Sequence, residues 1–136
     1  MTLMTVISPA AALFGRLLLI AIFLLEAWSK INGYAGAAAY MQKFGVPGAL
    51  LPLVILVEII GSLLIAIGWQ TRLAALALAG FCVSAAALFH SNLALKNEAL
   101  HFWKDIGLTG GFLLLIAHGP GQWSLEEKTN RPRNVP

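Results

Sequence analysis

Two apolar runs meet at one short polar hinge in the stretch VEIIGSLLIAIGWQTRLAALALAG, residues Val57–Gly80. The hinge is WQTR, residues 69–72, and it separates a run from about residue 50 to 68 from a run from about 73 to 90. Because a helix needs about 20 apolar residues to cross a bilayer, each run is long enough to span one. So short a hinge predicts that the two spans form an antiparallel hairpin.

The rest of the chain has the same apolar character. Of its 136 residues, 59% are hydrophobic and only 11% are charged, whereas a soluble domain is about 25% charged. This composition excludes an independent soluble domain. Two further apolar runs, from about residue 10 to 29 and from about 103 to 118, complete a set of four. We therefore predict an all-α fold, an integral membrane four-helix antiparallel bundle.

The connecting segments divide the chain into one domain and a tail. Residues 1–121 are expected to form a single transmembrane domain. In its first loop, apolar residues at three- and four-residue spacings within 34–44 predict a short helix in the headgroup plane. Residues 122–136 carry too little apolar content to fold alone, so we expect a polar, partly disordered tail. Within it, SLEE at 124–127 has capping-box spacing, but no apolar run follows, which favours a frayed turn.

Basic residues give the orientation of the spans. If the chain has four spans, five basic residues lie on the side of the termini: Arg16, Arg72, Lys128, Arg131 and Arg133. Four lie on the opposite side: Lys30, Lys43, Lys96 and Lys104. This small excess favours both termini facing the cytoplasm. The basic residues are scattered singly, which is typical of membrane-edge anchoring and not of nucleic-acid binding.

Six ionisable residues are expected in one half of the bundle: Glu26, Lys30, Glu58, His90, Lys104 and Asp105. Ionisable groups at membrane depth are costly and mark pairing or function. Two interpretations stay open at this point. The groups line a polar pocket that exchanges protons with a quinone headgroup, or they form a salt-bridge network that locks the helices together, with Glu58 pairing with Lys30, His90 or Arg16.

Glu58 is the deepest of these groups, eight positions into its span, or roughly 12 Å along the helix axis. Gly61 and Ser62 follow one turn later, so the carboxylate shares a face with small residues and is expected to point inward. On the fourth span, small residues form a second packing face: Gly107, Gly110 and Gly111. Glu26 and Lys30 have the spacing of an intrahelical ion pair, whereas Lys104 is expected to extend toward the interface.

The sequence does not favour metal binding or thiol chemistry. His90 and His101 are close enough in sequence to share a metal, but no third ligand has the spacing of a metal motif, so no metal site is predicted. The single Cys82 excludes thiol–disulfide exchange within one chain, and a packing role is expected for it.

The order of several motifs resembles the DoxX family of small four-helix bacterial membrane proteins. These motifs are EAWSKINGY (Glu26–Tyr34), FGVPG (Phe44–Gly48), the hairpin stretch (Val57–Gly80), FHSN (Phe89–Asn92), FWKDIGLTGGFLLL (Phe102–Leu115) and GPGQWSLEE (Gly119–Glu127). Members resemble subunits of membrane oxidoreductases, including a thiosulfate:quinone oxidoreductase, and one branch is linked to oxidative-stress complexes. The resemblance implies a quinone-linked redox role. It also implies that the six ionisable residues and Arg72 occupy the family's polar positions.

Two functions from different classes follow. The first is a subunit of a quinone-linked oxidoreductase in the bacterial inner (plasma) membrane, in which Glu58, His90 and Asp105 face the headgroup and Lys30 or Lys104 balances their charge. We expect a quinone ligand, no covalently bound cofactor, and a redox centre supplied by another membrane or redox subunit. The second is a non-enzymatic accessory or scaffold subunit of a larger membrane complex. A small carrier is a weaker third, because four short helices enclose little volume.

Overall fold

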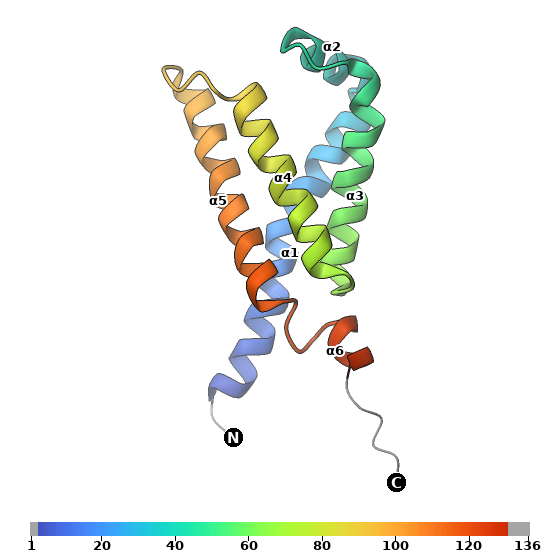
Figure 1. Ribbon diagram of the computed structural model, residues 1–136, viewed down its shortest axis with the longest axis vertical. Coiled ribbons are helices and arrows are strands. Elements are labelled where there is room, and N and C mark those ends of the chain that lie inside the picture. Colours follow the sequence, from blue (N-terminus) through green and yellow to red (C-terminus); the bar gives the residue numbers. More distant parts are fainter. Residues whose placement is uncertain (1–2, 131–136) are drawn as a thin grey trace.

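The computed structural model describes residues 3–130, and over this range it consists of helices and loops, with no strand (Figure 1). Four long helices run in alternating directions: α1 (Leu3–Asn32), α3 (Leu51–Ile67), α4 (Thr71–Phe89) and α5 (Lys96–His118). Three short elements complete the chain: α2 (Tyr34–Lys43), the 3-10 turn η1 (Gly48–Leu50) and α6 (Leu125–Asn130). The predicted all-α antiparallel bundle, with its short helix in the first loop, is confirmed.

Each long helix contains a segment that is long and apolar enough to cross a membrane. These segments are Ile7–Asn32, Gly48–Ile67, Thr71–Phe89 and Lys96–His118. The start of α1 and the short helix α6 lie at one end of the bundle, and α2 lies at the other (Figure 1). Of the basic residues expected on the side of the termini, Arg131 and Arg133 lie outside the described residues.

The α3–α4 turn follows from its glycine. Gly68 adopts a left-handed conformation with a φ of 71°, which ends α3 and lets the Trp69 N–H donate to the Leu64 carbonyl at 3.0 Å. This pattern satisfies carbonyls that the end of a helix leaves free, and glycine adopts it without a side-chain clash. The chain then reverses into α4. Gly61 marks the close approach of the two helices, since a Cβ there would lie 3.1 Å from Leu78.

Small side chains of α4 form the centre of the apolar core. They are Ala74, Ala75, Ala79 and Cys82, all at most 5% exposed. Aromatic rings fill the space that they leave, and the Phe23 and Phe112 rings from α1 and α5 lie 5.4 Å apart. A second, smaller apolar cluster joins the end of α1 to α2 and α3: Ala27, Met41, Leu51 and Ile55. This cluster holds α2 across the end of the bundle.

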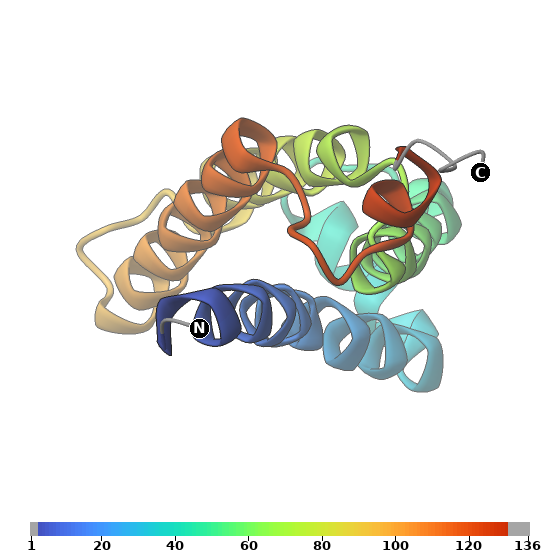
Figure 2. The same ribbon diagram turned by 90° about the horizontal axis from the view of Figure 1, so that it is seen from below.

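The tail differs from the expected frayed turn, because residues Leu125–Asn130 form α6. The capping-box spacing is used, and Ser124 Oγ accepts a hydrogen bond from the Glu127 N–H at 3.3 Å. The anchors come from the α3–α4 turn: the Glu126 N–H donates to the Gly68 carbonyl at 2.9 Å, and Glu126 Oε1 accepts from the Thr71 N–H at 2.6 Å. Figure 2 shows α6 beside this turn, so tertiary contacts stabilise a helix that the tail's own composition does not predict.

Arg16 was expected at the membrane edge, but it is only 3% exposed. Its guanidinium donates to the Ile65 carbonyl at 3.1 Å and to the Trp123 carbonyl at 2.6 Å. Ile65 belongs to the last turn of α3, where its carbonyl accepts from the Gly68 N–H at 3.2 Å, and the cation adds a second donor at the negative end of the helix. Arg16 thereby ties α1, α3 and the segment before α6 together and closes this end of the bundle.

Helix α5 begins at Lys96, seven residues before the apolar run that was expected to start at about Trp103. The additional turns are polar, but their backbone follows the helix, and the Ala99 N–H donates to the Leu95 carbonyl at 2.9 Å. Glu98 lies in the first turn, where a negative side chain is favourable near the helix N-terminus. The helix thus extends beyond the apolar segment toward α2.

Candidate functional site

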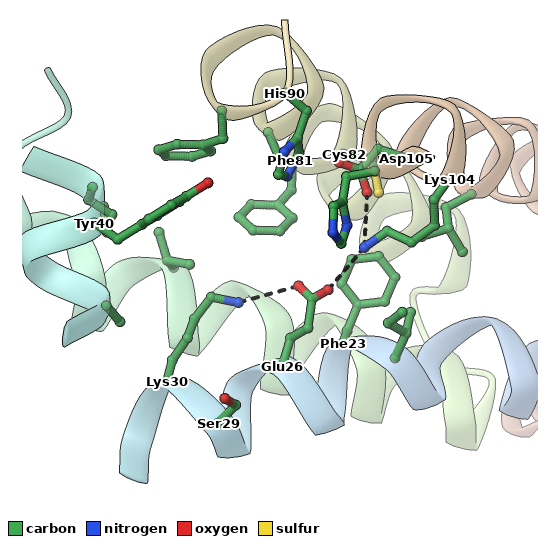
Figure 3. A pocket seen from close by; sticks show the side chains of 18 of the residues that line it. Phe23, Glu26, Ser29, Lys30, Tyr40, Phe81, Cys82, His90, Lys104 and Asp105 are labelled. Carbon is green, nitrogen blue, oxygen red and sulfur yellow. Dashed lines mark hydrogen bonds and ion pairs between the residues drawn. The ribbon is translucent and has the colours of Figure 1, made fainter. Parts of the chain in front are cut away.

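A pocket of about 410 Å³ opens between α1, α2, α3, α4 and α5, at the end of the bundle that holds α2 (Figure 3). Phe23, Phe81 and Phe89 contribute aromatic rings to its apolar wall. Its polar side chains come from four helices: Glu26, Ser29, Lys30, Tyr40, Cys82, His90, His101, Lys104 and Asp105. The structure therefore brings five of the six predicted site residues to one cavity.

Five charged side chains form a continuous network beside this pocket. Lys30 Nζ lies 2.7 Å from Glu58 Oε1 and 3.4 Å from Glu26 Oε2. Lys104 Nζ lies 3.2 Å from the other Glu26 oxygen and 3.7 Å from Asp105 Oδ1. The order is therefore Glu58, Lys30, Glu26, Lys104, Asp105, and it crosses α3, α1 and α5. We call these five residues the charge network.

The network gives Glu26 the central position. Each of its two carboxylate oxygens contacts one lysine, and its side chain is 39% exposed. The terminal carboxylates are more deeply buried, with Glu58 at 0% and Asp105 at 9% side-chain exposure. Three carboxylates and two ammonium groups leave a formal charge of −1 when all are ionised. A buried site with this balance favours a bound proton or an uncharged ligand over an anion.

Lys104 differs from its expected extension toward the interface. Its ammonium turns inward to Glu26, because the carboxylate on α1 faces it across the bundle and an ion pair is stronger where water is scarce. Thr109, one turn beyond Asp105, donates its hydroxyl to the Asp105 backbone carbonyl at 2.8 Å. A salt-bridge network between the helices and a pocket lined by the same side chains therefore occur together.

Glu58 does not line the pocket, although it was expected to face the headgroup. Its side chain points inward on α3 and is covered by the neighbouring helices, and it is linked to the pocket through Lys30. Its second oxygen, Oε2, is buried without a hydrogen-bond partner within residues 3–130, and so is Ser62 Oγ one turn later. Glu58 is thus connected to the pocket through its contact with Lys30.

His101 lines the pocket and Glu98 contacts His90 at its edge, but the sequence reasoning placed neither of them there. His90 Nδ1 lies 2.7 Å from Glu98 Oε2, and the His90 ring stacks on His101 with centroids 4.9 Å apart. Glu98, His101 and Asp105 are three and four residues apart, so one face of α5 presents all three. That spacing was a usable signal, but the fourth apolar run was predicted to begin only at about residue 103. Within residues 3–130, no group of three His, Cys, Asp or Glu side chains is placed to hold a metal ion.

Tyr40 is the polar pocket residue that α2 contributes, and Figure 3 shows its hydroxyl directed into the cavity. Its ring packs against Phe44 and Phe89, with centroids 5.0 and 5.6 Å away. Burial, together with the negative charge of Glu98, raises the pKa of the Tyr40 phenol above its usual value. The hydroxyl is therefore a neutral hydrogen-bonding group over a wide pH range.

The predicted packing residues fall into two groups. Gly61 and Gly111 lie at close contacts inside the bundle, and a Cβ on Gly111 would lie 3.0 Å from Leu19 of α1. Gly107 and Gly110 are exposed and have no heavy atom within 4 Å of an added Cβ among the described residues. Arg72 is exposed at the start of α4, at the opposite end of the bundle from the pocket.

The fold and the site together define a small integral membrane protein: four spanning helices around a pocket lined by charges. The DoxX family model matches residues 11–91. The chain belongs to the DoxX family.

Two relatives from Escherichia coli K12 match nearly the whole chain. One is the inner membrane protein YqjF, 45% identical over 125 residues that cover 92% of this chain and 96% of the relative. The other is the inner membrane protein YphA, 30% identical over 127 residues that cover 88% of this chain and 91% of that protein. No solved structure matches the chain.

Proposed function

We propose that this protein is the quinone-binding membrane subunit of an oxidoreductase. The observation that carries the proposal is the pocket itself, in which an aromatic wall faces a line of ionisable groups at one end of the bundle. A ligand that fits must be flat and apolar over most of its surface and must carry hydrogen-bonding oxygens. A quinone ring has both properties.

The apolar wall suits such a ring in size and chemistry. A cavity of about 410 Å³ lies within the range of roughly 300–1,000 Å³ usual for small-molecule sites. Phe23 and Phe81 have ring centroids 6.3 Å apart in an edge-on arrangement, which leaves aromatic faces and edges for a planar ligand. The surrounding helices extend into lipid, where a hydrophobic quinone tail resides.

The polar side supports the chemistry of the ring oxygens. Lys30 and Lys104 supply ammonium donors suited to carbonyl oxygens, while Glu26, Asp105 and His90 are groups that take up and release protons. Reduction of a quinone adds electrons and protons to those oxygens. The electrons would come through a redox centre of a partner subunit, and this chain's residues would hold the ring and exchange its protons.

Native mass spectrometry of the protein, released from its own membrane in mild detergent, tests the proposal. We expect a retained quinone together with a stoichiometric redox partner. Ala85→Phe places a ring inside the pocket and should lower quinone retention by about tenfold or more, because the ligand and the new ring need the same space. Ala87→Phe, on the exposed face of the same helix, should leave retention unchanged. Equal retention in both variants would contradict the proposal.

A second candidate, an accessory subunit of a larger membrane complex, is favoured by the outward position of Gly107 and Gly110. Small residues on a lipid-facing surface allow another helix to approach closely. On this account Gly110→Leu lowers the yield of the complex while the isolated bundle remains folded. Gly111→Leu is the contrasting variant, because its side chain would meet Leu19 and destabilise the bundle itself.

The location that we propose is the bacterial inner membrane, with both termini in the cytoplasm. The names of both relatives place those proteins in the inner membrane. Arg16 contacts the segment before α6, Arg72 lies in the first turn of α4 and Lys128 in α6 itself, so all three lie at that end of the bundle. A fluorescent-protein fusion at the C-terminus should fluoresce, since the fluorophore matures in the cytoplasm. Activity of a periplasmic reporter at the same position would contradict this orientation.

A further inference from the structure

A histidine–glutamate pair stands at the edge of the pocket. His90 Nδ1 lies 2.7 Å from Glu98 Oε2, and the two side chains are 17% and 28% exposed. An ionised carboxylate only accepts hydrogen bonds, so Nδ1 carries the proton and donates it. In the neutral ring, Nε2 is then left with a lone pair and acts as an acceptor.

The orientation of the His90 ring is set from two sides. Glu98 holds Nδ1, and His101 stacks on the ring with an interplanar angle of 24°. Both neighbours belong to α5, whereas His90 ends α4. Within residues 3–130, Nε2 has no hydrogen-bond partner, and His90 lines the pocket (Figure 3). Nε2 is therefore a fixed acceptor available to a pocket ligand.

We propose that His90 Nε2 accepts a hydrogen bond from a ring hydroxyl, so that the pocket prefers the reduced hydroquinone form of its ligand. This inference rests on the proposed function and adds the form of the ligand that is recognised. A quinone carbonyl has only lone pairs to present to Nε2, whereas a hydroquinone hydroxyl donates to it and still accepts from a lysine. Glu98 is the positioning residue, because it fixes the tautomer of His90.

The preference depends on the tautomer of His90. A ring whose proton sits on Nε2 is a donor there and no longer selects a hydroxyl. The other ionisable groups around the pocket are His101, Lys104 and Asp105 on α5, Glu26 and Lys30 on α1, Tyr40 on α2 and Cys82 on α4. Of the carboxylates, Glu98 makes the direct contact with His90. In Glu98→Gln, whose amide oxygen still accepts from Nδ1, the preference is therefore retained, whereas Glu98→Leu releases the tautomer and lowers the preference.

Titration calorimetry of the purified protein in mild detergent, without oxygen, tests the inference. The three probes are 1,4-naphthohydroquinone, its dimethyl ether and 1,4-naphthoquinone. At about pH 8 we expect the hydroquinone to bind about tenfold more tightly than the ether, the effect of one net hydrogen bond. His90→Phe should bring this ratio to about one while the ether still binds. The exposed His118→Asn, at the far end of α5, should keep the wild-type ratio.

The outcomes separate this inference from the proposed function. If naphthoquinone binds but the hydroquinone shows no preference over its ether, the inference is overturned and the proposed function stands. If none of the three probes binds, both are overturned. Should His90→Phe fold poorly, the Glu98 variants decide by themselves: a preference retained in Glu98→Gln and lowered in Glu98→Leu supports the inference, and an equal preference in both overturns it.

Discussion

Replacing Lys30 tests whether the charge network holds the spans together. Its ammonium lies 2.7 Å from Glu58 Oε1, and it is the only hydrogen-bond partner of that carboxylate within residues 3–130. Lys30→Met keeps the length of the side chain and removes the charge. Because Glu58 is 0% exposed, the change leaves a buried carboxylate uncompensated, which typically costs about 3–5 kcal/mol.

The structure places the effect at the lower end of this range. Lys30 is 23% exposed, so water screens part of the interaction. We therefore expect the free energy of unfolding to fall by about 3 kcal/mol. The double variant Lys30→Met with Glu58→Met replaces the pair by apolar side chains of similar volume, and it should lie within about 1 kcal/mol of the wild type. Lys43→Met, an exposed position on α2, is the control and should change little.

Denaturation in mixed micelles, followed by far-ultraviolet circular dichroism, gives these free energies. The four proteins are wild type, the two single variants at positions 30 and 58, and the double variant, which together form a mutant cycle. The reasoning is refuted if Lys30→Met unfolds within about 0.5 kcal/mol of the wild type. It is also refuted if the double variant loses the sum of the two single losses, since the pair would then carry no coupling.

Two further predictions concern the α3–α4 turn and the pocket tyrosine. Gly68→Ala should lower the free energy of unfolding by more than about 1 kcal/mol, because the φ of Gly68 is +71° and the new methyl would collide with the Arg16 guanidinium. Gly80→Ala is the control in the same denaturation assay: its methyl enters open space, so no loss is expected. Because its pKa is raised, the Tyr40 phenol stays neutral to higher pH. Tyr40→Phe should therefore remove the part of the tyrosinate absorbance titration that lies above about pH 10. If the variant instead loses the part at lower pH, the prediction is contradicted.

Most of the fold could be predicted because apolar length and short hinges determine it. The WQTR hinge fixed the α3–α4 hairpin, and the apolar residues within 34–44 indicated α2. The hydrogen bonds that Arg16 donates to the Ile65 and Trp123 carbonyls could not be predicted. The acceptors are backbone carbonyls 49 and 107 positions away, and every residue has such a carbonyl, so no sequence pattern marks them. The helix α6 likewise depends on contacts with a distant segment, the α3–α4 turn.

The candidate site could be predicted in composition but not in geometry. The ionisable residues at membrane depth indicated the correct end of the bundle. Only the structure shows that Glu26 contacts two lysines and that Glu58 contacts Lys30 without lining the pocket. Side-chain direction across a bundle depends on how the helices rotate against one another, which periodicity alone leaves open. Glu98 was missed because a polar helical turn resembles a loop when only hydropathy is considered.

The central claim is that the pocket beside α2 binds a quinone ring. Photo-crosslinking with an azido-naphthoquinone in native membranes tests this claim most directly. Peptide mass spectrometry then locates the covalent label. We predict labelling around Tyr40, Phe81 and His101, which all line the pocket, and its loss when excess unlabelled naphthoquinone is added. Label confined to lipid-facing residues such as Leu18 and Leu114, insensitive to that excess, would show partition into the bilayer and contradict the claim.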